Sequence, residues 1–262
     1  MRLQEFADRL LSVRAGAPEF DAVPEPLRPR DLAEAYAVAD LLVAALASAL
    51  GGVAGYKVGA TSTQGQQLLG LTEPFFGRNF AQRIRRDGAS WDAAGRPCSV
   101  EAEVGFVLGK DLPARRSAYS LSEVRAAVDR VVPLLEINRP AFKRPFDAGG
   151  LCLVADNGVT QGLVIGGPGG PLLAEGSLSG ETVRMFHNDA VCAEGAAAAV
   201  LGDPINALWW LANALRVRGR GLHAGETIAS GAITPPIPLV AGDRIVAEYS
   251  TLGRVALDVE RP

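Results

Sequence analysis

Residues 100–108 place the strongest constraint on how this chain can fold. They read Val-Glu-Ala-Glu-Val-Gly-Phe-Val-Leu, and the alternation of apolar and acidic residues at the start predicts a β-strand. Side chains two residues apart lie on the same face of a strand, so Glu101 and Glu103 are expected side by side. Two adjacent carboxylates repel each other unless a cation lies between them or one of them stays protonated. This strand therefore needs open water, a positive partner, or a carboxyl group that stays protonated.

A third acid, Glu136, follows a second apolar run within residues 131–137. Together the three carboxylates offer a set of hard oxygen ligands, which suits Mg²⁺ or Mn²⁺ better than Zn²⁺. The alternative is that Glu101 and Glu103 lie on a solvated sheet face, because antiparallel sheets commonly expose one polar face. The spacing of the acids leaves both interpretations open.

Lys57 is the only charged residue in the apolar run 53–60, which is predicted to be another strand. Burying an unpaired ammonium group is costly. We therefore expect Lys57 either to reach the edge of the sheet with its aliphatic stem covered, or to meet an anion.

Composition narrows the class of protein. The chain has 262 residues, 48% of them hydrophobic, which is enough for one large domain or two small ones. Its 26 Lys and Arg against 29 Asp and Glu give a net charge of −3, and no basic cluster is interleaved with aromatic residues, so no nucleic-acid partner is expected. The longest apolar run, residues 41–55, is shorter than the ~20 residues of a membrane-spanning helix. The N-terminus lacks the apolar core of a signal peptide, and the three cysteines are far apart, so we expect a cytoplasmic protein without membrane contact.

The order of the predicted elements indicates the fold class. Apolar spacing and capping residues predict helices over residues 3–14, 31–50, 61–70, 120–130 and 203–219. Strands are predicted near residues 53–60, 100–108, 131–137, 151–155, 159–165, 181–187 and 189–194, and after the turns at 224 and 241. Residues 73–77 are expected to form a turn, residues 82–97 a loop, and the basic segment 138–149 either a solvated linker or a lid over an anionic substrate. Helices followed by many short strands predict an α+β fold with a mostly antiparallel or mixed sheet.

Several ordered motifs resemble those of the fumarylacetoacetate hydrolase superfamily. Within it, they are most similar to the branch of the 2-keto-4-pentenoate hydratases and 4-oxalocrotonate decarboxylases. The matching pieces run from about Gly55 to the C-terminus. Among them are Gly-Tyr-Lys-Val-Gly-Ala-Thr-Ser at 55–62, Glu-Ala-Glu-Val-Gly-Phe-Val-Leu at 101–108, Leu-Glu-Ile at 135–137, Ala-Asp-Asn at 155–157 and Leu-Gly-Asp-Pro-Ile-Asn-Ala at 201–207.

The resemblance implies a mixed β-roll with an N-terminal helical segment. The helical segment would cover residues 1–72 and the catalytic β-roll residues 73–262, as one continuous structural unit. Glu101, Glu103 and Glu136 would hold Mg²⁺ or Mn²⁺. The catalytic residues would be Lys57 and Asp156. Substrate contacts would come from Phe76, Arg139, Gly231 and Ala232.

The family's substrates are small 2-oxo or 2-hydroxydienoate acids, whose carboxylate and 2-oxygen can chelate a metal ion. The first expectation is a hydratase that converts a 2-hydroxy-2,4-dienoate into a 4-hydroxy-2-oxo acid in the breakdown of aromatic compounds. The alternatives are a decarboxylase of a 4-oxalocrotonate-like 2-oxo diacid, an acylpyruvate C–C hydrolase, and a binder of oxo acids without turnover. The C–C hydrolases generally use a His with an acid, and no His precedes Glu101 here. A homo-oligomer is expected.

The resemblance is imperfect after Glu136. The branch typically continues with Asp-Ser-Arg, whereas this chain reads Asn-Arg-Pro-Ala at 138–141. The basic residues Arg139, Lys143 and Arg144 in this region suggest the hypothesis that the substrate carries a second carboxylate.

Overall fold

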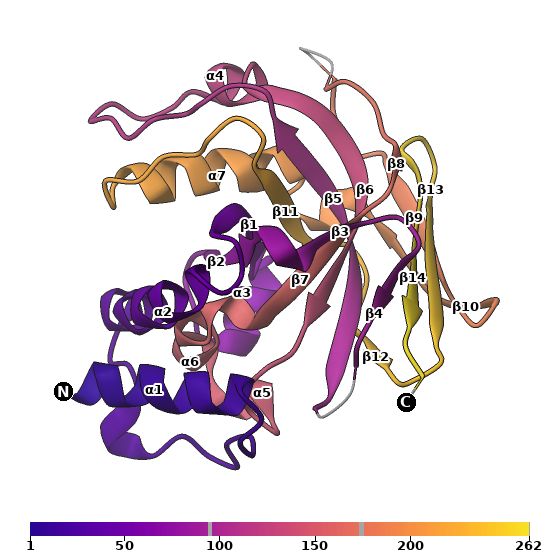
Figure 1. Cartoon of the computed structure of the whole chain (residues 1–262). Coiled ribbons are helices and arrows are strands. Elements are labelled where there is room, and N and C mark those ends of the chain that lie inside the picture. The colour runs from indigo at the N-terminus through magenta and orange to yellow at the C-terminus, as the bar shows by residue number, and fades with distance from the viewer. Residues whose placement is uncertain (94–95, 173–175, 262) are drawn as a thin grey trace.

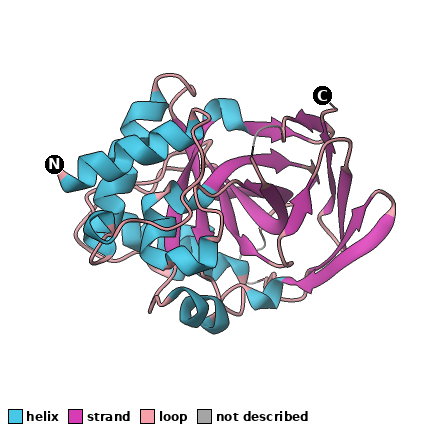
Figure 2. Ribbon diagram, turned by 90° about the horizontal axis from the view of Figure 1, so that it is seen from below, coloured by secondary structure: helices cyan, strands magenta, loops and turns pink. Residues whose placement is uncertain are grey.

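Two mixed β-sheets form the body of the protein, and helices gather at one end of it (Figures 1 and 2). The computed structural model describes residues 1–93, 96–172 and 176–261. None of the described helices is long and apolar enough to cross a membrane. The prediction of an α+β fold is confirmed.

Among the described residues, eight strands make up the first sheet. Seven of them follow the order β2-β1-β11-β5-β6-β7-β3, and β12 pairs with β5. The strands are β1 (Val53–Gly59), β2 (Phe75–Phe80), β3 (Ile84–Arg86), β5 (Cys98–Leu108), β6 (Val128–Asn138), β7 (Thr160–Ile165), β11 (Thr227–Ala232) and β12 (Ile237–Leu239).

The second sheet has six strands in the same described ranges, ordered β10-β9-β13-β14-β4 with β8 paired to β14. They are β4 (Ala89–Trp91), β8 (Gly167–Pro168), β9 (Thr182–His187), β10 (Ala190–Ala196), β13 (Arg244–Tyr249) and β14 (Gly253–Val259). It packs against the first sheet near β6 (Figure 1).

The helices lie mostly before and between these strands. They are α1 (Arg2–Arg14), α2 (Leu32–Ala47), α3 (Thr63–Leu69), α4 (Leu121–Arg125), α5 (Pro145–Ala148), α6 (Gly150–Ala155) and α7 (Pro204–Arg216). Short 3₁₀ turns are η1 (Glu25–Leu27), η2 (Ala81–Arg83), η3 (Asn157–Val159) and η4 (Ala197–Ala199). Helices α1, α2 and α6 share a second apolar cluster, whereas Ala35 and Tyr36 of α2 pack in the main core. Strand β1 nevertheless lies inside the first sheet, so that sheet includes residues on both sides of position 72.

Strand β5 separates charge from apolar surface by the two-residue period that its sequence predicts. Val100, Ala102, Val104 and Phe106 alternate along one face and are completely buried in the main core. The opposite face carries Glu101 and Glu103. The apolar face therefore anchors the strand that presents the acids.

Tyr249 on β13 connects the two sheets behind these acids. Its buried hydroxyl lies 2.7 Å from the carbonyl oxygen of Glu103 and 3.0 Å from that of Leu134, and it can donate its proton to either. A buried hydroxyl at this distance is a good hydrogen-bond donor. The second sheet thus supports the backbone of β5 and β6 where the acids lie.

One predicted strand, residues 151–155, is wrong, because these residues form helix α6. Cys152, Leu153, Val154 and Ala155 are all buried. A short run that is apolar throughout has no periodicity to distinguish a buried helix from a buried strand.

Two other predictions are also corrected. Residues 73–77 do not form only a turn, since β2 begins at Phe75. The predicted loop 82–97 contains β3 and β4, and its residues 94–95 lie outside the described ranges.

Replacing Tyr249 with Phe removes the hydroxyl that reaches across the sheets and leaves the ring in place. We expect the free energy of unfolding to fall by about 1–2 kcal/mol, because a buried hydrogen bond is lost. Chemical denaturation monitored by circular dichroism measures this change.

Tyr56→Phe is the matched control. Tyr56 is equally buried, but its hydroxyl has no hydrogen-bond partner among the described residues. It should therefore change stability by less than about 0.5 kcal/mol. Equal losses for the two variants would contradict a bridging role for Tyr249.

Candidate active site

The three acids singled out in the sequence lie together in the structure. Glu101 and Glu136 face each other directly in the antiparallel pairing of β5 and β6, and Glu103 is the next residue on the same face of β5. One carboxylate oxygen from each of the three lies within 4.8 Å of the others. Glu103 and Glu136 are buried, whereas Glu101 is partly exposed. The interpretation as a solvated sheet face does not fit this burial.

Hydrogen bonds hold these carboxylates in place without satisfying them. The side-chain amide of Asn138 donates to Glu101 Oε2 at 2.9 Å and to Glu136 Oε2 at 3.4 Å. The backbone N–H of Gly231 donates to Glu103 Oε2 at 2.7 Å. Oε1 of Glu103 and Oε1 of Glu136 are buried and have no hydrogen-bond partner. Buried carboxylate oxygens without a partner are costly, so the donor set calls for a cation.

Lys57 supplies the only positive charge that pairs with this cluster among the described residues. Its Nζ lies 2.8 Å from Glu136 Oε2, and its side chain is 6% exposed. Of the two expectations for Lys57, the structure shows the contact with an anion. Gly77 on β2 makes room for the lysine stem, because a Cβ there would lie 2.3 Å from the carbonyl oxygen of Asn157 and 3.2 Å from Lys57 Cγ.

The electrostatics show that one ammonium group does not balance three carboxylates. Burial raises the pKa of Glu101 to about 7, although Lys57 opposes the rise. Burial and the neighbouring Glu136 raise the pKa of Glu103 well above its usual range. Burial alone would lower the pKa of Lys57, but the charges of Glu136, Glu103 and Glu101 outweigh it and raise that pKa. Lys57 therefore stays protonated, and the raised pKa values of Glu101 and Glu103 show that one ammonium group is not enough to stabilise all three carboxylates in their ionised form.

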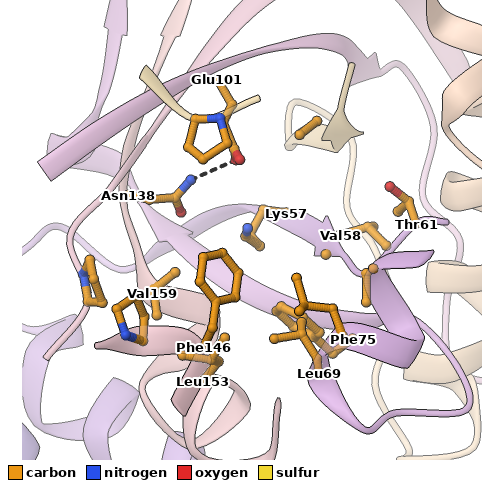
Figure 3. Close-up of a pocket in the computed structure, with 18 of the residues that line it drawn as sticks. Lys57, Val58, Thr61, Leu69, Phe75, Glu101, Asn138, Phe146, Leu153 and Val159 are labelled. Carbon is orange, nitrogen blue, oxygen red and sulfur yellow. Dashed lines mark hydrogen bonds between the residues drawn. The ribbon is translucent and has the colours of Figure 1, made fainter. Parts of the chain in front are cut away.

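A cavity of about 310 Å³ opens onto this cluster (Figure 3). Lys57, Glu101, Glu103 and Asn138 line one end of it, and the first residues after β1, from Ala60 to Ser62, line a side. Its volume is at the lower end of the range for small-molecule sites. The arrangement fits a small acid that places its charged end against Lys57 and the carboxylates.

Two of the predicted substrate contacts lie at this site. Ala232 lines the cavity, and Gly231 reaches it through its backbone N–H. Gly231 has φ of +122°, and a Cβ there would lie 2.3 Å from Thr61 Oγ1, so this close approach requires glycine.

The other three predicted residues lie elsewhere. Phe76 stacks on Tyr36 with ring centroids 4.4 Å apart. Arg139 donates from its guanidinium to the carbonyl oxygen of Asp92 at 2.9 Å. Asp156 is completely buried, and its carboxylate accepts hydrogen bonds from Arg14 and from the backbone N–H of Ala141, both at 2.8 Å. None of the three is among the residues that line the described cavity.

Some lining residues were not predicted. Asn138 lies two residues after Glu136 on the same strand face, and the two-residue period was a signal that could have found it. Phe146 lies in α5, within the segment expected to be irregular, and no periodic pattern indicated that it would line the cavity.

Residues 71–260 match the family model described as "Fumarylacetoacetate (FAA) hydrolase C-terminal". The chain belongs to the fumarylacetoacetate hydrolase family. Among curated members, the 2-keto-4-pentenoate hydratase of Paraburkholderia xenovorans LB400 is 35% identical over 98% of this chain and 93% of its own length. The 4-oxalocrotonate decarboxylase of Pseudomonas sp. CF600 is 32% identical over 78% of this chain and 76% of its own.

Solved structures agree with this placement. The 4-oxalocrotonate decarboxylase from Pseudomonas putida G7, complexed with magnesium and adipate, superimposes with a TM-score of 0.89 at 28% identity, covering 98% of this chain and 97% of that one. Fumarylpyruvate hydrolase from Pseudomonas aeruginosa has a TM-score of 0.60 at 14% identity and covers 79% of this chain and 89% of its own, which shows the shared fold alone. The fold and branch that the sequence motifs indicated are confirmed.

Replacing Gly231 with Ala tests the close approach at this site. We expect a loss of more than about 2 kcal/mol in the free energy of unfolding, because the new Cβ adds a clash with Thr61 to the backbone strain. Gly16→Ala is the control, since Gly16 also has a positive φ (+109°) but a Cβ added there would meet no atom within 4 Å beyond its chain neighbours. Gly16→Ala should lose only about 1 kcal/mol. Thermal or urea unfolding of both variants measures the difference, and a loss no larger for Gly231→Ala would contradict the contact.

Proposed function

We propose that this protein is a divalent-metal-dependent hydratase that adds water to a 2-hydroxy-2,4-dienoate to give a 4-hydroxy-2-oxo acid. The observation that carries the proposal is the buried trio of Glu101, Glu103 and Glu136, with two unpaired oxygens, next to Lys57 in one cavity. Relatives at 33–35% identity named 2-keto-4-pentenoate hydratases support it.

The three carboxylates would hold Mg²⁺ or Mn²⁺, because they form an all-oxygen, strongly negative donor set. Bound there, such an ion supplies Lewis-acid polarisation of the substrate's 2-oxygen. Structures of the 4-oxalocrotonate decarboxylase from Pseudomonas putida G7, complexed with magnesium and with calcium, support a divalent ion at this site. Asn138 would orient the set, since it donates to both Glu101 and Glu136.

Lys57 would act on the same end of the substrate. Its ammonium stabilises negative charge that develops on the 2-oxygen, and it carries the proton that can be exchanged as the dienol becomes a ketone. Transfer of the proton from the 2-hydroxyl to C5 converts the dienol into a 2-oxo-3-enoate, whose C3=C4 double bond is conjugated with the new ketone and therefore electrophilic at C4. Water then adds its hydroxyl at C4 and a proton at C3. Thr61 and Ser62 line the same cavity, and a hydroxyl group there can hydrogen-bond the incoming water.

A decarboxylase of a 4-oxalocrotonate-like 2-oxo diacid is the second candidate. The close structural match to the decarboxylase from Pseudomonas putida G7 favours it. Both reactions draw on the same stabilised charge at the 2-oxygen, and they differ in whether water is gained or CO₂ is lost. The mass of the product therefore separates them.

We further propose that the protein works as a homo-oligomer in the cytoplasm. Exposed apolar side chains on and just after α7, Trp209 and Val217, support an interface, and the three cysteines are all free, as in a reducing compartment. Sedimentation equilibrium would give the size of the assembly.

The first test is the ultraviolet absorbance of 2-hydroxypenta-2,4-dienoate mixed with metal-free protein, then with added Mg²⁺ or Mn²⁺. We expect loss of the dienol only after metal is added, with a product heavier by one water. Turnover that is unaffected by a chelator would contradict the metal requirement, and metal-replete protein that leaves the dienol unchanged would contradict the hydratase.

Two variants separate metal binding from proton handling. Glu103→Gln should weaken Mn²⁺ binding by more than about tenfold, because it removes a charged ligand. Lys57→Met should lower kcat roughly 10²- to 10⁴-fold and retain Mn²⁺ binding. Isothermal titration with Mn²⁺ and steady-state kinetics measure the two effects. Lys110→Met, at an exposed lysine outside the cavity, is the control and should change neither. Loss of Mn²⁺ binding in Lys57→Met would contradict the division of roles.

A further inference from the structure

We propose that the cavity selects a 2-hydroxydienoate whose far end carries an apolar chain rather than a second carboxylate. The inference rests on the proposed function, because it assumes that the acid end of the substrate lies against Lys57 and the three carboxylates. It concerns the opposite end of the same cavity, around Leu69, Phe146 and Leu153.

The cavity is polar at one end and apolar at the other. In Figure 3, the labelled side chains of Leu69, Phe75, Phe146 and Leu153 gather on the side away from Glu101. Lys57 lies between Glu101 and this apolar group. Among the described residues that line the cavity, the ionisable ones are Lys57, Glu101 and Glu103, and the one cation of these, Lys57, is paired with Glu136. The apolar end therefore offers no cation to a second carboxylate.

Two of the apolar lining residues are unusually exposed. Leu68 on α3 is 63% exposed and Phe146 on α5 is 55% exposed. Covering large apolar side chains that border a cavity and still face solvent removes apolar surface from water, which favours binding of an apolar ligand group. An alkyl or aryl group on the substrate would cover both, whereas a carboxylate there would lose water without gaining a partner.

The basic residues that suggested a dicarboxylate are engaged elsewhere. Lys143 forms an ion pair with Asp21 at 2.8 Å, and Arg144 forms one with Asp147 at 3.0 Å. The guanidinium of Arg139 is bonded to the carbonyl of Asp92. These contacts therefore argue against the hypothesis that Arg139, Lys143 and Arg144 hold a second carboxylate.

The N-terminal segment holds the loop of residues 138–149 in place. Phe20 pairs with it through two backbone hydrogen bonds, from Phe20 N to Ala141 O at 2.9 Å and from Lys143 N to Phe20 O at 3.0 Å. This pairing places Lys143 at a neighbouring cavity of about 450 Å³, which Glu19 also lines. The ammonium group of Lys143 forms its ion pair with Asp21 there. Phe146, which belongs to the same loop as Lys143, lines the first cavity instead.

Binding of stable 2-oxo acids tests the inference without requiring turnover. With Mg²⁺ present, calorimetry would compare 2-oxopentanoate, 2-oxononanoate and 2-oxoheptanedioate. We expect 2-oxononanoate to bind more tightly than 2-oxopentanoate by about fourfold for each methylene buried. It should also bind at least about tenfold more tightly than the diacid. Equal affinity for the short and long chains, preference for the diacid, or no binding of any of the three would overturn the inference.

Substitutions locate the selectivity. Leu68→Lys places a cation at the apolar rim and should raise affinity for the diacid while lowering it for 2-oxononanoate. Leu121→Lys, at an exposed leucine on α4 outside the cavity, is the matched control and should leave both unchanged. Lys143→Ala should also leave the affinity for the diacid unchanged. A loss of diacid binding in Lys143→Ala would restore the dicarboxylate hypothesis in place of this one.

Kinetics with the corresponding 2-hydroxydienoates distinguish this inference from the function on which it rests. Turnover of the diacid with a higher kcat/KM than the alkyl-substituted dienoate would overturn the tail assignment and leave the hydratase intact. Tight binding of 2-oxononanoate with no turnover of any dienoate would overturn the hydratase and leave the tail assignment intact.

Discussion

The ion pair between Lys57 and Glu136 is the interaction around which the site is organised. It joins β1 to β6 across two intervening strands of the first sheet, because the order runs β1-β11-β5-β6. Glu101 and Glu103 lie on β5 between the two partners, so the ammonium group of Lys57 interacts electrostatically with all three acids. A buried pair is stable only when its remaining groups are also satisfied, and here two carboxylate oxygens are not. A cation bound there would provide these oxygens with a partner and favour the ionised form of all three acids.

The rest of the fold makes that arrangement rigid. The reverse face of β5 is packed into the main core, and Tyr249 holds the backbone at Glu103 from the second sheet. Glycine at positions 77 and 231 lets the backbone approach the lysine stem and Thr61. Preorganisation of this kind matters because polar groups fixed before the substrate arrives do not have to reorient during the reaction.

Local pattern predicted the parts of the site that depend on one strand. The two-residue period placed Glu101 and Glu103 together, and the cost of burying a lone ammonium group indicated that Lys57 would meet an anion. The pairing of Glu101 with Glu136 depends on strand register, which a single sequence does not show. Asp156 illustrates the limit most clearly, because its carboxylate bonds Arg14, 142 residues away in the chain. Likewise, the apolar run before it had no period from which helix α6 could be told from a strand.

Asp156 also connects parts of the molecule that are far apart in the chain. Its carboxylate holds helix α1 through Arg14 and the loop before α5 through Ala141, so the N-terminal helix helps to set where Phe146 lies. The acid end of the cavity is built instead from β1, β5 and β6, deep in the sheet. Substitutions in the first helix or in this loop can therefore alter the cavity through Asp156, although they lie far in sequence from the acids. The selectivity of the site thus depends on residues that never touch the substrate.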